Sequence, residues 1–385
     1  MNILRRLFER RDASTDASWK ALQDRGTLSA SGQFVDARSA EGISTVFGCV
    51  QALSESTATL PLHLYARLDN GDRQRADDYP LARVLRQPTE ILTGFGFREM
   101  MTATVLLHGN AWARIDRNGS GEVIGLEPIH PRSVAVVRLP NGRYRFDVTM
   151  PDGSISRFLQ DELFHLADRT EPESILGKSR IQVARDTLGL ALAQREHGSS
   201  VFRNGAMPSG VLETPHVMDT AQMQRIGESW RNRFAGVGNA GKTPVLEHGM
   251  QYKAISMNME DAQWIAAQQF STEEICRMFR VPPTIVGDLR HGNYSNTAEL
   301  GGQFVRYSLT RWIAMWETAI SSQLLGPIAR RRYHAEHSVE GLLRGNPEAR
   351  ADFYGKAIQD GWMTVNEVRQ LENLPQLDKE SANVG

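Results

Sequence analysis

The sequence has few cysteines, no long apolar run and no excess of charge of either sign. Its two cysteines, Cys49 and Cys276, lie far apart in the chain within apolar helical patterns. This excludes a disulfide framework and a cysteine-based zinc site, and predicts two small buried hydrophobes. No stretch approaches the roughly 18 apolar residues of a membrane span. The start, MNILRRLFERRDAS, is basic and amphipathic but lacks the apolar core and cleavage site of a secretory signal, which predicts a protein that stays in the cytosol.

Positive and negative side chains nearly cancel. Forty-four Lys and Arg stand against 45 Asp and Glu, a formal net charge of −1, and no basic block breaks the balance. A tight, non-specific DNA binder needs a positive face to neutralise phosphates, and the balance offers none unless charge is segregated by face. Of the 385 residues, 41 % are hydrophobic and 23 % charged. These values are ordinary for a soluble globular protein with roughly two or three structural units.

The first half of the chain has the patterns of an α+β fold with antiparallel strands. Residues 1–40 are polar and predict a flexible arm. Apolar spacing predicts a helix from about residue 44 to Pro61 and another around 97–107. Between 62 and 166, four dipeptides predict tight hairpin turns with φ > 0 between alternating strands. They are Asn70-Gly71, Asn118-Gly119, Asn141-Gly142 and Asp152-Gly153.

The second half returns to helical periodicity. Helices are predicted over about 179–203 and 260–280, from an Asn296/Glu299 capping box to about 325, and in two shorter segments that begin at Asn346 and Thr364. Between the first two lies a small β-α-β-β insert with strands GVLE, PVLEH and QYKAIS, which is too small to bury much core alone. Helices this long need partners along their apolar faces, and neighbouring subunits are a natural supply.

A phosphate-loop pattern, G-x-x-x-x-G-K-T, occurs at Gly236–Thr243. In a nucleotide site this loop follows a buried strand and opens a helix, so that backbone N–H groups converge on phosphate. Here the order is reversed, because the preceding segment is helical and Pro244 opens a predicted strand. The order favours a glycine-rich connection over a nucleotide site. A nucleotide-binding assembly factor is kept as the alternative function.

Other single residues carry less chemical information. His334 and His337 are three apart, close enough on a helix to share a metal, but no third ligand has persuasive spacing, and a solvated polar face is favoured. Gly109 in His108-Gly109-Asn110 suits a left-handed helix end. Glu127 and Asp168 are single carboxylates at strand ends without a partner that spacing identifies. Residues 346–373 form a loose helix–turn–helix whose second helix is nearly neutral, which favours a scaffold over a DNA reader.

The loop between the two longest predicted helix runs is the richest in polar chemistry. It carries a cation, a histidine, amides and an aromatic ring, in the order Asp288, Arg290, His291, Asn293, Tyr294, Ser295, Asn296. Such a mixture can contact phosphates and sugars without reading bases. Composition alone favours an ordinary polar crossover.

The order of the motifs resembles the portal protein of tailed bacteriophages, in its long-tailed siphophage group. The similar segments include GCVQALSESTATLPLHLY, LLHGNAWARI, GLEPIHPRSV, LGKSRIQVAR, FRNGAMPSGVLE, DAQWIAAQQFSTEEICRMFRVPPTIVG, NYSNTAE and DGWMTVNEVRQLENLP. They cover roughly residues 42–375. The same ring serves a phage, a prophage or a gene transfer agent, and the sequence does not separate these.

The resemblance implies the division of the chain. Residues 1–40 would be a flexible arm, 41–178 an α/β wing, 179–203 and 258–281 two stem helices, 204–257 a small α/β clip, 282–297 a tunnel loop, 298–344 a long wing helix and its return, and 345–385 a helical crown.

The resemblance also implies the function and the residues that serve it. Portal proteins form a ring, usually of about twelve copies, at one capsid vertex, and double-stranded DNA is packaged and ejected through its axis. The implied DNA-channel candidates are Arg290, His291, Asn293, Tyr294, Ser295 and Asn296. The implied clip residues for docking are Arg231, Arg233, Asn239, Lys242 and Lys253. Expected partners are the large terminase, the head-tail adaptor and the major capsid protein, with no membrane, cofactor, metal or catalytic residue. The expected location is the virion, and host cytoplasm during assembly.

Overall fold

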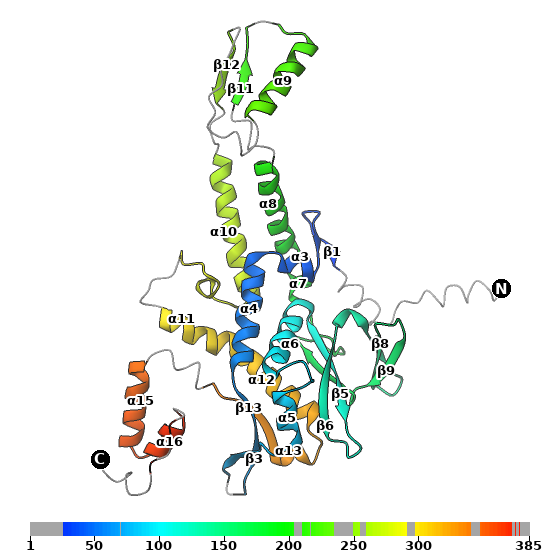
Figure 1. Ribbon diagram of the computed structural model, residues 1–385, viewed down its shortest axis with the longest axis vertical. Helices are drawn as coiled ribbons and strands as arrows, with labels where there is room; N and C mark the ends of the chain where they lie inside the picture. The colour runs from blue at the N-terminus through cyan, green and yellow to red at the C-terminus, as the bar shows by residue number, and fades with distance from the viewer. Residues whose placement is uncertain are drawn as a thin grey trace, which may run out of the picture. The chain divides into compact units, whose positions relative to one another are not determined.

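The structure is a computed structural model that describes residues 26–69, 71–203, 210–215, 217–234, 249–254, 259–290, 297–339, 347–371, 374 and 377. Its internal contacts divide the chain into two units. The first consists of Met1–Ala52, Ala103–Ala113 and Pro128–Val286, and the second of Leu53–Thr102, Arg114–Glu127 and Gly287–Gly385. The mixture of helices and antiparallel strands confirms the α+β class (Figure 1).

Helices α4 (Ser44–Thr59) and α6 (Gly94–His108) and strands β5 (Asn110–Arg117) and β6 (Val123–Ile129) contribute residues to both units. Both helices were expected from their apolar spacing and are confirmed. Strand β10 (Leu163–Ala167) completes a three-stranded sheet in the order β10-β5-β6.

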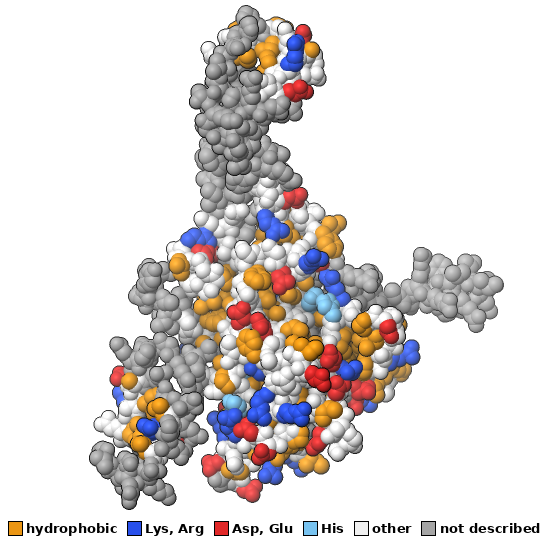
Figure 2. Space-filling model, viewed as in Figure 1, with side chains coloured by type: hydrophobic (Ala, Val, Ile, Leu, Met, Phe, Trp, Pro, Cys, Tyr) orange, Lys and Arg blue, Asp and Glu red, His pale blue; other side chains and the backbone are white. Residues whose placement is uncertain are grey.

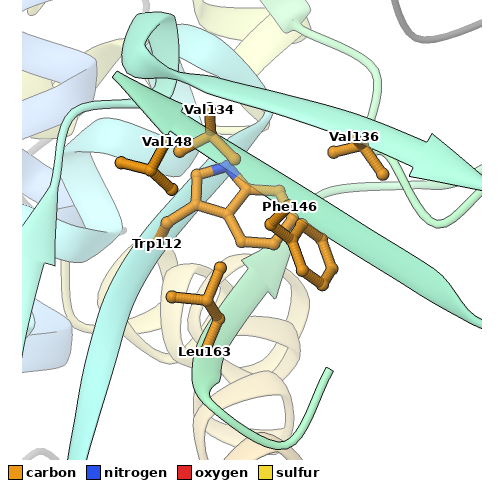
Figure 3. Packing of buried hydrophobic residues seen from close by; sticks show 6 residues of the cluster. All are labelled: Trp112, Val134, Val136, Phe146, Val148 and Leu163. Carbon is orange, nitrogen blue, oxygen red and sulfur yellow. The ribbon is translucent and has the colours of Figure 1, made fainter. Parts of the chain in front are cut away.

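A three-stranded meander of the first unit carries an apolar core. Its strands are β7 (Val134–Arg138), β8 (Tyr144–Thr149) and β9 (Ile155–Leu159), which follow the short helix η1 (Pro131–Ser133). Their alternate side chains meet one indole ring (Figure 3): the buried cluster is Trp112, Val134, Val136, Phe146, Val148 and Leu163. The period-two alternation of β7 and β8 places every second residue on this inner face.

Three of the hairpin turns differ from the expected tight type with two φ > 0 residues, because at 118–121, 141–142 and 152–153 a glycine alone has positive φ: Gly121, Gly142 and Gly153. The N–H of each of these glycines donates to the carbonyl three residues earlier, as does that of Gly71, which also has positive φ; Asn70 lies outside the described residues. The register is that of a longer turn closed by a glycine bulge. At Asn118-Gly119 the left-handed residue is Gly121, two positions later than predicted.

Two antiparallel helices form the long axis of the first unit. They are α8 (Arg185–Arg203), preceded by α7 (Arg180–Val183), and α10 (Met259–Phe279), and they lie side by side (Figure 1). Both predicted helices are confirmed, with a break at Ala184 between α7 and α8. Cys49 on α4 and Cys276 on α10 are both buried, as expected, and their thiols meet in a hydrogen bond that, with burial, raises the pKa of Cys49.

The end of the segment expected to be a flexible arm is ordered. Residues 27–41 form a hairpin of β1 (Thr27–Leu28) and β2 (Phe34–Val35), followed by α3 (Ala37–Glu41). Asp36 and Ser39 cap α3 reciprocally, and Val35 and Ala40 are fully buried. The polarity of the segment does not reveal this order, because the hairpin is held by α7 and α8, which lie about 155 residues later in the chain.

The insert between α8 and α10 contains β11 (Gly210–Glu213), α9 (Thr220–Phe234) and β12 (Gln251–Ala254). Strands β11 and β12 pair antiparallel, with Val211 opposite Lys253. These elements agree with the predicted insert. The predicted strand PVLEH lies outside the described residues.

The second unit is built on a sheet in the order β13-β3-β4, from β13 (Tyr333–His337), β3 (Leu62–Arg67) and β4 (Arg73–Arg75). Its helices are α5 (Pro80–Arg86), α11 (Thr297–Phe304), α12 (Thr310–Ala319), α13 (Ala329–Arg332), α15 (Pro347–Gln359) and α16 (Val365–Leu371). Two π-helical segments, η5 (Val305–Leu309) and η6 (Ile320–Leu324), flank α12, so the long helix predicted to about residue 325 is present with local widening. Trp312 and Trp316 of α12 are buried, and the indole N–H of Trp316 donates to Thr102 at 3.0 Å.

Within the described parts of the chain, we find no helix with the length and apolar character needed to cross a membrane.

Candidate functional site

The chain leaves α10 through a tight reversal that sets the start of the loop. The N–H of Val281 donates to the carbonyl of Cys276 at 2.9 Å, and the N–H of Arg280 donates to that of Arg277 at 3.1 Å. This is the Schellman end of a helix, with Arg280 at φ 60° in the left-handed position that glycine usually occupies. A short helix η3 (Pro283–Val286) and Gly287, at φ 87°, follow. Sequence reasoning attributed the helix end to Pro282 and Pro283, and the structure adds the reversal at Arg280.

Arg290, the one DNA-channel candidate within the described residues, is held by a carboxylate of its own loop. Its Nε donates to Asp288 Oδ1 at 2.8 Å, its Nη2 donates to Asp288 Oδ2, and its backbone N–H donates to Oδ1 at 3.2 Å. A two-pronged contact of this kind fixes the plane of the guanidinium. Its positive charge is therefore largely compensated within the loop.

A buried ion pair supports the end of α10 from the other side. Arg180 Nε donates to Asp168 Oδ2 at 2.6 Å, and the two side chains are 14 % and 6 % exposed. The same guanidinium reaches the carbonyls of Met278 at 3.4 Å and Phe279 at 3.3 Å. These carbonyls belong to the last turn of α10. No N–H group within the helix follows to pair with them. Arg180 thus joins α7, the end of β10 and α10.

The residues around this pair are packed backbone against backbone. Gly109 has φ 80°, as predicted, and a Cβ there would lie 2.6 Å from the Ser179 nitrogen. The side chain of Asn110 donates to the Gly177 carbonyl at 3.0 Å and accepts from the Gly177 N–H at 2.8 Å. The hydroxyl of Ser179 donates to Leu107 and accepts from the N–H of Gln182, which caps α7. The start of α7 is therefore seated directly on the end of α6.

A stacked histidine continues this buried polar group. His165 lies on Trp112 with ring centroids 3.5 Å apart and planes 6° apart, and its Nε2 meets Asn110 Oδ1 at 3.0 Å. Burial lowers the pKa of His165 to about 3. The ring is therefore neutral near pH 7 and serves packing.

The other predicted channel residues lie outside the described residues: His291, Asn293, Tyr294, Ser295 and Asn296. The predicted helix cap at Asn296 therefore also lies outside them. Among the docking candidates, Lys253 on β12 is exposed, with Nζ 3.5 Å from Glu213 Oε1 on β11. Arg231 and Arg233 lie on α9, and Asn239 and Lys242 lie outside the described residues.

The histidine pair His334 and His337 is not on a helix. Both lie on strand β13, where residues three apart point to opposite faces, so they cannot share a metal ion. The favoured alternative, a solvated polar face, is also wrong for His337, because its side chain is buried and its Nδ1 lies 3.1 Å from Glu317 Oε1. In the described ranges, no cluster of three or more His, Cys, Asp or Glu side chains could hold a metal ion.

The phosphate-loop pattern at Gly236–Thr243 follows a helix, as predicted. Helix α9 ends at Phe234, two residues before the pattern begins, where a nucleotide site requires a strand. The loop itself lies outside the described residues.

Charges of both signs are interspersed on the molecular face shown in Figure 2, where Lys and Arg side chains stand among Asp and Glu. Surface ion pairs such as Arg143–Asp161 and Arg145–Asp147 account for part of this mixing. On that face, charge is not segregated into one positive area.

Two functional contacts escaped sequence reasoning. Asp168 was a carboxylate without an identifiable partner, and Arg180, twelve positions later, has no periodic relation to it. Asp288 was noted as part of the polar loop but not as the partner of Arg290. The sequence does indicate the Asp288–Arg290 contact. An aspartate two residues before an arginine, in a loop that contains glycine, is close enough to form a bidentate contact with it.

The fold is shared with a chain in a solved particle structure. The chain is similar to one in the neck of a native gene transfer agent particle computed with C12 symmetry, with TM-score 0.61 and 23 % identity, over 88 % of this chain and 92 % of that one. This similarity shows that the two chains share a fold.

Sequence comparison gives the family. The family model described as phage portal protein matches residues 44–373. The portal protein of Enterobacteria phage HK97 is 35 % identical over 343 residues, 87 % of this chain and 79 % of that protein. The probable portal protein of Streptomyces phage phiC31 is 30 % identical over 374 residues, 93 % of this chain and 80 % of that protein. The chain belongs to the phage portal protein family. These matches contain nothing that supports the nucleotide-binding alternative.

Proposed function

We propose that the chain is one subunit of a ring-shaped channel at a single capsid vertex, through which double-stranded DNA is packaged and ejected. The family match over residues 44–373 carries the proposal. The C12 symmetry of the similar neck structure supports a ring of twelve copies. The ring acts at the portal vertex of the virion and assembles in the host cytoplasm.

The loop after α10 is the part of the subunit that we assign to the DNA. Arg290, His291, Asn293, Tyr294, Ser295 and Asn296 would face the axis. The Asp288 contact supports a weak interaction, because a guanidinium already paired with a carboxylate gains less from a phosphate than a free one. A lining that holds phosphates through many free cations would resist the movement of the duplex.

The insert around α9 would dock other proteins. Arg231, Arg233, Asn239, Lys242 and Lys253 are the candidates for contact with the large terminase during packaging and later with the head-tail adaptor. The exposure of Lys253 on β12, which pairs with β11, supports its part in this surface. The wing would meet the major capsid protein.

No catalytic residue, cofactor or metal is required of this subunit. The channel positions DNA and proteins, and the terminase supplies the ATP hydrolysis that drives packaging. The ion pairs described above act as structural supports.

The mass of the purified particle tests the proposal. Twelve copies of the 43.0 kDa chain weigh roughly 0.5 MDa. Native mass spectrometry should give a species of that size, and electron micrographs should show a ring with a central hole. A particle that stays at 43 kDa and shows solid globules would refute the channel.

A further inference from the structure

The segment 326–333 of the second unit is a turn that is held at both of its ends. It follows η6 and contains α13, which leads into β13 (Figure 1). Arg330 fastens the first end, because its Nε donates to the carbonyl of Leu325 at 2.9 Å and its Nη2 donates to that of Ser322 at 2.5 Å. At the other end, Tyr333 pairs with Ala66 in the ladder of β13 and β3. The turn therefore has a defined position on the sheet.

Arg332 is held on an aromatic ring at the end of this turn. Its guanidinium lies 5.7 Å from the centre of the Tyr333 ring, and the ring centroids of Tyr333 and Tyr79 are 4.4 Å apart. Tyr333 is half-buried and Arg332 is exposed. A cation over an aromatic face is attracted to the ring without losing its charge. Arg332 is thus positioned, and its positive charge remains available to a ligand.

Two hollows in the surface adjoin the turn, and Tyr333 lines both of them. The first has a volume of about 480 Å³, and Pro327, Ile328 and Ala329 line it beside Arg332. Ile328 is 86 % exposed, so most of its side chain is open to a partner. A hollow with this lining can accept an apolar side chain.

The second hollow is lined by polar side chains. It has a volume of about 350 Å³, and its walls include Arg67, Thr318 and Ser321. Guanidinium and hydroxyl groups donate hydrogen bonds, and a carboxylate accepts several of them at once. This lining favours an anionic group in the second hollow.

The positive charge along the two hollows has no local counter-charge. Three arginines line them, Arg67, Arg330 and Arg332, against one carboxylate, Glu317. Glu317 already accepts a hydrogen bond from the N–H of His337 at 2.7 Å. Among the described residues, none of the three guanidinium groups forms an ion pair with a carboxylate. Electrostatic complementarity therefore favours an acidic ligand at this surface.

The neighbouring arginines of the same sheet are balanced. On β4, Arg73 pairs with Glu336 of β13, and Arg75 pairs with Asp77. The unbalanced positive charge is thus a feature of the two hollows and not of the whole sheet.

The two hollows form one surface because they share Tyr333. We call it the turn surface, and its members are Arg67, Pro327, Ile328, Arg332 and Tyr333. We propose that the turn surface binds an acidic segment of a partner protein, in which carboxylates flank an apolar side chain. The apolar side chain enters the first hollow beside Ile328, and the carboxylates pair with Arg332 and Arg67.

The chemistry of the turn surface favours a protein over DNA as the ligand. Phosphates would meet the arginines, but the DNA backbone offers no apolar group to cover Ile328. Interfaces between proteins combine apolar and aromatic side chains with arginine in the way that this surface does. The inference does not depend on the proposed ring.

The first test removes positive charge and measures the binding of an acidic peptide. The probe is the fluorescein-labelled peptide Asp-Glu-Leu-Phe-Glu-Asp, whose anisotropy is followed as the full-length protein is added. Its dissociation constant should rise about fivefold or more in Arg67→Ala/Arg332→Ala. It should stay unchanged in Arg143→Ala/Arg157→Ala, which removes two exposed arginines from the β7-β8-β9 meander. Equal affinities in the two double variants, or no saturable binding to the wild-type protein, would overturn the inference.

The second test addresses the apolar side chain. Ile328→Ser should weaken the binding of the same peptide about threefold or more. Ile155→Ser is the matched control, because Ile155 is 64 % exposed on β9 and should have no effect. Far-ultraviolet circular dichroism checks that each variant folds. If folded Ile328→Ser bound the peptide as tightly as the wild-type protein, the surface would attract charge alone and the inference would be wrong.

Two further measurements separate other ligands of the turn surface. If a short labelled DNA duplex displaced the peptide and required Arg67 and Arg332, the surface would be a nucleic-acid site and the inference would be overturned. The particle mass should be the same in Arg67→Ala/Arg332→Ala as in the wild-type protein. Loss of the ring in that variant would assign the surface to contact between copies and would also overturn the inference. A wild-type chain that forms no ring but binds the peptide as expected would overturn the proposed function alone.

Discussion

The guanidinium of Arg180 forms a buried ion pair with Asp168 and also reaches the last carbonyls of α10. One side chain therefore satisfies a carboxylate at the end of β10 and the open end of a helix that begins elsewhere in the chain. Because the loop assigned to the DNA starts a few residues after that helix end, the pair sets where the loop leaves the fold.

Removal of either member of the Arg180–Asp168 pair should lower the stability of the fold. In Asp168→Ala the guanidinium loses its counter-charge inside the protein, and such changes cost about 3–5 kcal/mol of unfolding free energy. The control is Asp77→Ala, which breaks an exposed contact with Arg75 and should cost less than about 1 kcal/mol. Denaturant titration followed by tryptophan fluorescence measures both. If both substitutions lowered the free energy of unfolding by equally small amounts, the buried Arg180–Asp168 pair would not contribute to stability.

The loop should hold DNA more tightly when its internal pair is broken from the acidic side. In Asp288→Asn, Arg290 keeps its charge and loses its carboxylate partner, so the salt dependence of DNA retention should steepen by roughly 0.9 in log–log slope for each new phosphate contact. Asp161→Asn, which frees Arg143 on another turn, is the control. Filter retention of labelled duplex over a series of salt concentrations gives the slopes. If the two variants had the same slope, the loop would not contact the DNA.

Loss of the loop's basic side chains should affect DNA and leave assembly intact. Arg290→Ala with His291→Ala should alter packaging or retention of DNA at an unchanged ring mass. A narrowest channel constriction formed by residues outside 282–297 would contradict the assignment.

Stability should fall with acid below about pH 6.5 because of His165. Its pKa is about 3 in the folded state, below its ordinary value of 6.5, so the unfolded chain binds more protons between these values. The stabilisation is complete above pH 6.5 and decreases as the pH falls toward 3, by up to about 1.4 kcal/mol per pH unit. In His165→Gln, which retains a group able to bond Asn110, the fall in melting temperature between pH 7 and pH 5 should be smaller. Burial also lowers the pKa of His108, to about 4, so part of the loss of stability in acid should remain in this variant. A pH profile identical to wild type would contradict this role.

Gly109 should not tolerate a side chain. Its φ of 80° is strained for other residues, and a Cβ would lie 2.6 Å from the Ser179 nitrogen, so Gly109→Ala should cost more than about 1 kcal/mol and lower the melting temperature. Gly119→Ala is the control, because Gly119 has no positive φ and nothing lies within 4 Å of its Cβ position. Calorimetry compares the two. Similar melting temperatures would mean that the junction of α6 and α7 relaxes freely.

Local physics determined the elements that depend on neighbours in the chain. Apolar residues at helical spacing predicted α8 and α10, and Gly109 predicted a left-handed helix end, because periodicity and backbone freedom are properties of short segments. The ordered motifs predicted the family. The turn at Asn118 shows the limit: a dipeptide indicates that the chain turns, while the register of the paired strands decides which glycine takes positive φ.

Tertiary structure alone decided the contacts between distant segments. Residues 27–41 are polar enough to suggest an arm, yet they are ordered because α7 and α8 supply hydrogen-bond acceptors and α8 supplies a glycine against which the hairpin packs. His337 became buried because β13 pairs with β3 and brings it to Glu317. Asp168 pairs with Arg180 because the segment between β10 and α7 reverses the direction of the chain. Such pairings have no sequence period, since the free energy that selects them comes from burial and charge brought together only in the folded chain.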